Sequence, residues 1–76
     1  MNKERRKTIE EISNELSELR DKIQSVIDEE QEAYDNLPES FQQGERGETM
    51  EAAIDEMNEA VCSVESAMDS LESAME

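Results

Sequence analysis

The sequence predicts an all-α fold, an antiparallel two-helix coiled-coil hairpin that we expect to assemble as a dimeric four-helix bundle. Two apolar patterns with a seven-residue repeat predict the helices, and the one proline between them predicts where the chain turns. A chain of 76 residues forms at most one domain. We therefore expect a single hairpin over residues 1–76, with helix one at about 4–36, a connection at 37–45 and helix two at about 46–75.

Helix one is predicted by apolar residues that follow one another at alternating steps of three and four. They are Ile9, Ile12, Leu16, Leu19, Ile23 and Val26. This spacing puts two neighbouring rows of apolar side chains on one side of a helix and is typical of a coiled-coil seam. Glu30 stands where the next seam residue is expected. Its carboxylate either reaches water near the bundle end or pairs with a cation such as Arg46, since unpaired carboxylates are rarely buried.

The connection is predicted by Pro38, because the residue before a proline avoids the helical conformation. Residues 38–43 can form one short helical turn, and Gly44 can serve as the N-cap of helix two. Gly47 lies on the same row of helix two as Ile54. Its missing side chain permits a close approach of neighbouring backbone there.

Helix two is predicted by four seven-residue blocks that begin at Met50. Each block has an apolar residue in the first position, an alanine in the fourth and a large apolar residue in the fifth. In an antiparallel hairpin, helix one can place large side chains level with these alanines, for example Ile23 with Ala60, as close packing requires. We therefore expect the first- and fourth-position residues to close the hairpin.

This pairing leaves a second apolar surface uncovered, and we predict that it is an oligomer or partner interface. Its residues are Ile27, Tyr34, Ile54, Val61, Met68 and Met75. Soluble monomers rarely expose an apolar stripe of this length, and a twofold homodimer is the commonest way to cover one. A higher homo-oligomer or a different protein would cover it equally well.

The charge of the chain is strongly negative and unevenly distributed. The net charge is −15, and no basic residue follows Arg46. Such a surface repels phosphates, which argues against direct binding of nucleic acid. We expect an acidic surface on helix two that either docks on a basic protein or only keeps the chain soluble. Its residues are Glu51, Asp55, Glu59, Glu65, Asp69 and Glu72.

Enzymatic chemistry has little support in the sequence. The chain has no histidine, so the usual general base near neutral pH is absent, and Cys62 has no evident activating base. No calcium loop, zinc spacing or phosphate-binding glycine loop is present. We therefore expect no catalytic residue, no cofactor and no metal. With no membrane span and no signal peptide in the sequence, we expect a cytoplasmic protein.

A second hypothesis concerns the basic residues. If two hairpins pack antiparallel, the turn of one lies near the basic start of the other. A composite pocket could then hold a phosphate-bearing small ligand, because arginine suits phosphate contacts and aromatic rings stack on bases. The residues of this possible anion site are Arg5, Arg6, Lys7, Tyr34 and Arg46. The alternative is that these charges are simply solvated.

The central run from Glu30 to Ser40, followed by Glu45-Arg46-Gly47-Glu48, resembles a known group of sequences. These are short, acidic hypothetical proteins of Gram-positive bacteria, their phages and mobile elements. In that group the same Asn-Leu-Pro-Glu-Ser turn leads into a heptad helix rich in alanine and glutamate. Gly44 stands here where serine is common in the group.

The resemblance implies a small accessory protein rather than an enzyme. In a phage or mobile element, it would act in the cytoplasm of the bacterial host as an inhibitor of a host defence or nucleic-acid-handling protein. The charge pattern leaves two alternatives open. One is an oligomer that sequesters a phosphate-bearing signalling molecule, and the other is a structural oligomerisation element.

Overall fold

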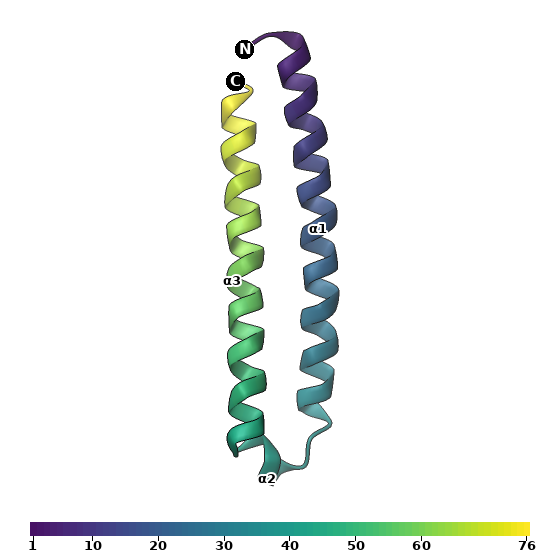
Figure 1. Cartoon of the computed structure of the whole chain (residues 1–76), viewed down its shortest axis with the longest axis vertical. Coiled ribbons are helices and arrows are strands. Elements are labelled where there is room, and N and C mark those ends of the chain that lie inside the picture. The colour runs from purple at the N-terminus through teal and green to yellow at the C-terminus, as the bar shows by residue number, and fades with distance from the viewer.

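The computed structural model describes all 76 residues as two long antiparallel helices joined by a short one (Figure 1). Helix α1 spans Lys3–Asp35, α2 spans Glu39–Gln42 and α3 spans Glu45–Ala74. The chain forms a rod of 58 × 15 × 11 Å with both termini at its open end. The all-α prediction is confirmed. The expected helix ranges, about 4–36 and 46–75, differ from the observed ones by one residue at each end.

The start of α1 is fixed by a side-chain cap. The Oδ1 atom of Asn2 accepts a hydrogen bond from the backbone N–H of Arg5 at 2.8 Å. Glu4 adds a negative charge in the first turn, where the helix dipole favours one. The helix ends at Asp35, with Asn36 as its C-cap, shortly before Pro38. The Asn2 cap therefore accounts for the start of α1, and Pro38 accounts for its end.

Gln42 ties the connection to the end of α1. Its Nε2 atom donates to the backbone carbonyl oxygens of Tyr34 at 3.0 Å and Leu37 at 3.1 Å. The Tyr34 carbonyl also accepts from the backbone N–H of Leu37 at 3.0 Å, so the Gln42 amide adds a second hydrogen bond there and joins α2 to the end of α1. Nothing in the sequence pattern singled out Gln42 for this role.

The contact between α2 and α3 depends on the absence of a side chain at Gly47. Gly47 is buried, and a Cβ atom there would lie 2.0 Å from the carbonyl oxygen of Gln42. Backbone therefore packs directly on backbone, as expected from the sequence. Gly44 is the N-cap of α3 in an extended conformation and makes no side-chain cap, also as expected.

The apolar seam between α1 and α3 is narrow. Ile27 and Ile54, which are 5% and 8% exposed, are its only buried apolar residues. Half-buried side chains extend the seam along both helices at steps of three and four. On α1 they are Ile9, Ser13, Leu16, Arg20, Ile23, Glu30 and Tyr34; on α3 and its C-cap they are Met50, Met57, Val61, Val64, Met68, Leu71 and Met75. Ser17 and Ala53, beside these rows, are half-buried as well.

On each helix one expected row lies in the seam, that of Leu16 on α1 and that of Met57 on α3, but the second row differs, so the expected pairing is wrong. Ile12, Leu19 and Val26 are 41%, 50% and 49% exposed. Ala60, Ala67 and Ala74 are exposed as well, although they were expected to face helix one. In their place the seam contains the predicted second surface: Ile27, Tyr34, Ile54, Val61, Met68 and Met75.

The physical reason lies at Gly47. Because Gly47 approaches Gln42 closely, the row of α3 that contains Gly47 faces α2 and α1. Residues separated by seven along a helix share a face, so Ile54 and Val61 turn inward with it. The alanine row then points away from the seam.

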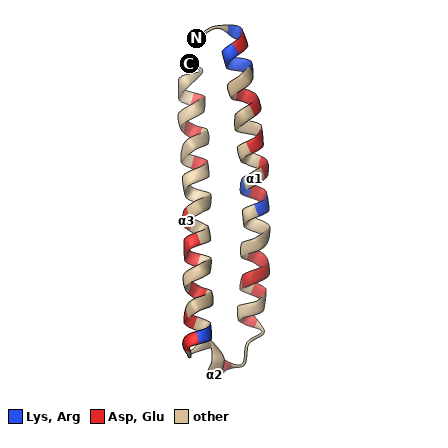
Figure 2. Cartoon of the chain, viewed as in Figure 1, with Lys and Arg blue, Asp and Glu red and all other residues tan.

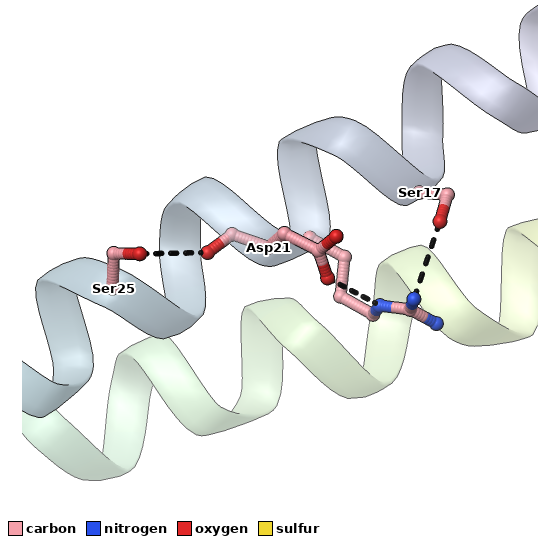
Figure 3. Close-up of polar contacts among 4 residues, drawn as sticks. Ser17, Asp21 and Ser25 are labelled. Atoms are coloured by element: carbon pink, nitrogen blue, oxygen red, sulfur yellow. Dashed lines mark hydrogen bonds and ion pairs between the residues drawn. The ribbon is translucent and has the colours of Figure 1, made fainter.

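Arg20 lies in this seam without a partner on α3. Its side chain is 33% exposed, and its Nε atom lies 3.5 Å from Oδ1 of the adjacent Asp21. Its Nη2 atom donates to Oγ of Ser17 at 3.2 Å. Figure 3 shows Ser17 and Asp21 along α1, with the Ser25 hydroxyl bonded to the Asp21 backbone. The guanidinium is thus held by residues of its own helix.

The Gly47 contact predicts a difference between the two glycines. Gly47→Ala forces the backbones apart and should lower the free energy of unfolding by about 1–3 kcal/mol. Gly44→Ser is the matched control, because a Cβ there meets only ordinary contacts and the hydroxyl can cap α3. It should raise stability by roughly a few tenths of a kcal/mol. Thermal unfolding followed by circular dichroism measures both. Equal stability of the two variants would contradict the contact.

The Gln42 amide makes a second prediction. Gln42→Glu keeps the shape but replaces the donor with a carboxylate beside two carbonyl oxygens. At pH 7 we expect a loss of about 1–3 kcal/mol in the free energy of unfolding. Gln43→Glu makes the same charge change at an exposed neighbour and should stay within about 0.5 kcal/mol of the wild type. Urea titrations compare them. A similar loss in both variants would show that added charge, not the lost donor, is responsible.

Candidate interaction faces

Four of the seven basic residues lie at the open end of the rod. Figure 2 shows them at the start of α1, where Arg5, Arg6 and Lys7 are all exposed. Arg46, at the start of α3, lies at the opposite end beside the turn. A single chain therefore does not bring the residues of the predicted anion site together. Tyr34, near the end of α1, also lies far from Arg5.

Tyr34 instead contacts α3. Its hydroxyl donates a 2.5 Å hydrogen bond to Oε1 of Glu51 and so fixes how the two helices lie along each other. This bond stabilises the neutral phenol. Together with desolvation and the negative charges of Glu51 and Asp35, it raises the pKa of Tyr34 above 10.0. The sequence could not reveal the contact, because it depends on the register of the two helices.

One side of the hairpin carries an acidic face. We define it by the exposed residues Asp21, Asp28 and Asp35 of α1 and Glu51, Asp55, Glu65, Asp69 and Glu72 of α3. A shallow hollow lined by Gln31, Tyr34, Glu51 and Asp55 shows that these rows of the two helices lie on the same side of the seam. The acidic residues expected on helix two are all exposed. Glu59 lies on the side of α3 opposite the seam and is therefore not part of this face.

The other side carries an apolar face. We define it by Ile12, Leu19 and Val26 of α1 and Ala60, Ala67 and Ala74 of α3, all exposed. At 100° per residue, each of these rows lies across its helix from the acidic row. Because the acidic rows share one side of the hairpin, the apolar rows share the opposite side. Large side chains thus line one half of this face and small ones the other half.

Charge is balanced on the side of the apolar face. Glu15, Glu29 and Glu56 are offset there by Arg5, Lys22 and Arg46. Between Ala60 and Ala74, the flanking residues of α3 are Ser63 and Ser70, which carry no charge. The net charge of −15 therefore comes mainly from the remaining surface.

The remaining residues singled out in the sequence form no chemical centre. Glu30 is half-buried and makes no ion pair, so the pairing with Arg46 that we considered does not occur. Cys62 is an exposed free thiol. No three His, Cys, Asp or Glu side chains lie close enough together to hold a metal ion. None of the helices has an apolar stretch that would cross a membrane.

Comparisons with protein-family models, with curated proteins and with solved structures gave no match to this chain. The two faces must therefore be interpreted from their own physical chemistry.

The Tyr34 contact predicts a specific pH dependence. Because the folded pKa lies above the unfolded value, Tyr34 stabilises the fold below about pH 10 and loses this contribution as the pH rises through the folded pKa. The chain has one tyrosine and no tryptophan, so the absorbance of the phenolate reports on it alone. We expect a midpoint above that of the unfolded chain, and a lower midpoint in Glu51→Gln. Equal midpoints in wild type and variant would contradict the contact.

Proposed function

We propose that this chain is a non-enzymatic acidic interaction protein that self-assembles through its apolar face and presents its acidic face to a basic protein surface. The observation that carries this proposal is the opposition of the two faces. One side is apolar, uncovered and balanced in charge, and the other is exposed and strongly negative. A single hairpin thus has two separate surfaces, each suited to a different kind of contact.

The exposed area of the hairpin supports self-assembly. A folded monomer of 8.7 kDa is expected to expose about 4,700 Å². This chain exposes 5736 Å², which is more than a compact monomer of its size. Only two apolar side chains are buried within the hairpin. Because so small a core gives little stability, covering the apolar face in a dimeric four-helix bundle would add much of what is missing.

The acidic face supports contact with a basic partner. Carboxylates from both helices point to the same side, and no basic residue follows Arg46 on α3. Such a face attracts a positively charged surface over a Debye length and speeds association. In a phage or mobile element, as the resemblance implies, that surface would belong to a host defence or nucleic-acid-handling protein. The carboxylates would then stand in for nucleic-acid phosphates.

Two alternatives share the self-assembly but differ in what the assembly does. A structural oligomerisation element would need the apolar face alone. A sponge for a phosphate-bearing small molecule would need two chains, since Arg46 and the basic start of α1 lie at opposite ends of one hairpin. Both alternatives predict that removing charge from the acidic face has no effect on function.

Charge removal from the acidic face tests the proposal. In Glu65→Gln/Asp69→Asn/Glu72→Gln, the salt-sensitive capture of a basic protein from bacterial lysate should be lost. The control Glu11→Gln/Glu18→Gln/Glu32→Gln removes the same charge from exposed positions on the back of α1. It should keep the partner. Capture is compared by quantitative mass spectrometry at salt concentrations of about 50 mM and about 500 mM.

Each possible result of this experiment is informative. Loss in the first variant alone supports the acidic face as the docking surface. Equal loss in both variants shows that only net charge matters, which would contradict a defined face. If the wild-type chain captures no basic protein at low salt, the proposed function is wrong.

A further inference from the structure

We infer that the apolar face is covered by a second copy of this chain, with α1 of one copy lying antiparallel on α1 of the other and Leu19 at the twofold axis. The inference rests on the self-assembly proposed above and specifies its surface, partner and orientation. The hairpin then becomes half of a four-helix bundle whose two turns lie at opposite ends.

The apolar rows of both helices have the arrangement that such a bundle requires. Each long helix has three neighbouring rows that are mostly apolar, although on α1 the row of Ile27 also contains Ser13 and Arg20. On α1 the row of Leu16 is central, the row of Ile27 packs on α3, and the row of Leu19 is uncovered. On α3 the row of Met57 is central and the row of Ile54 packs on α1, while the alanines are uncovered. A helix in a four-helix bundle contacts two neighbours, one on each side of its central row.

The size of the apolar face matches a second copy. The rod measures 58 by 15 Å across this face, so complete overlap buries roughly 800 Å² of each copy, which is the share of a standard protein interface. Leu19 is the central residue of Lys3–Asp35. An antiparallel α1–α1 contact centred on Leu19 therefore overlaps the whole of both helices and sets Ile12 level with the partner's Val26.

Charge selects the antiparallel orientation. The start of α1 is basic, with Arg5, Arg6 and Lys7, whereas its last turns carry Asp28, Glu29, Glu30, Glu32 and Asp35 without a basic residue. Centring on Leu19 lays each basic start on the partner's acidic end. It also sets Glu15 within one residue of the level of the partner's Lys22, twice per dimer. Flanking charges of this kind fix orientation in coiled coils.

The opposite orientation is electrostatically worse. With both turns at the same end, α1 of one copy would lie on α3 of the other. Of the acidic residues that flank the apolar face, Glu29 of α1 would then lie near Glu56 on α3 of the other copy. The four basic residues at the start of each α1 would also lie near those of the partner. Like charges placed together in this way disfavour an arrangement.

A second copy also fits the apolar face better than a basic protein does. The side of the apolar face has no net charge, so a basic partner gains nothing there and is attracted to the acidic face instead. Two copies packed through their apolar faces point their acidic faces away from each other. This arrangement keeps the repulsion between two chains of net charge −15 small.

Solution mass and one pair of variants test the surface. Light scattering on the full chain should give twice the chain mass of 8.7 kDa. Leu19→Glu should raise the dimer dissociation constant at least about 100-fold, because two carboxylates meet at the axis. Gln24→Glu adds the same charge at an exposed position on the other side and should stay dimeric. A monomeric wild type, or a Leu19→Glu variant that dimerises as the wild type does, would overturn the inference.

Disulfide formation tests the orientation without depending on the stability of Leu19→Glu. In a Cys62→Ser background, Leu19→Cys should form a disulfide-linked dimer on mild oxidation, and Gln24→Cys should not. The opposite orientation would bring Leu19 near the partner's Ala67. If cross-linking required a mixture of Leu19→Cys and Ala67→Cys chains, the antiparallel α1 contact would be wrong. The disulfide pattern tests the orientation alone, so the antiparallel contact can be wrong while self-assembly and the capture of a basic partner hold. A monomeric wild type would instead contradict the self-assembly on which both proposals rest.

Discussion

The backbone contact between Gly47 and Gln42 determines how α3 is rotated in the hairpin. A side chain at Gly47 would collide with the Gln42 carbonyl, so this row of α3 must face the connection. The same row then carries Ile54 and Val61 into the seam, and the alanines point outward. Gln42 holds the other end of the contact through its hydrogen bonds to the carbonyl of Tyr34, near the end of α1, and to that of Leu37 in the connection. The choice of seam, and hence of the uncovered face, follows from a few atoms at the turn.

The helices and the turn could be predicted from the sequence because they depend on local patterns. Heptad spacing and Pro38 place α1 and α3 to within one residue. The rotation of the helices could not be predicted with the same ease. On α3 hydrophobicity alone fits either pair of adjacent apolar rows, and on α1 it favours the row of Leu19 over the row of Ile27, which contains Ser13 and Arg20. Gly47 carries the signal that decides which rows of α3 form the seam. The sequence shows that its row allows a close approach, but it does not show that this row faces α1.

The candidate site was predicted less well, for a related reason. The acidic residues of α3 are exposed, as any charged row would be. The Tyr34–Glu51 contact depends on helix register, which no local pattern encodes. Ser13 and Arg20 lie in the seam, although polarity alone would place both on the outside. The geometry of the turn, rather than the polarity of these two side chains, places them in the seam.

The seam is strongest near the turn. Ile27, Gly47 and Ile54 are the only buried residues, and all three lie in that half of the rod. Towards the open end, Ser13 and Arg20 replace apolar side chains, so little holds the first turns of α1 to the last turns of α3. Ile12 lies uncovered in this same half, and Leu19 lies uncovered at the middle of the rod. A second copy would therefore add contacts where the hairpin has fewest, and local opening should begin there when the copy is absent.

The position of the acidic face has a consequence for stoichiometry. If the apolar faces pack together, the assembly displays two identical negative surfaces that point in opposite directions. Such an object is bivalent, and one dimer can hold two molecules of a basic partner. Against a partner that is itself dimeric or arrayed on a polymer, binding through both surfaces gains avidity from effective concentration without any new contact. The dimer would then cross-link two partner molecules rather than block a single one.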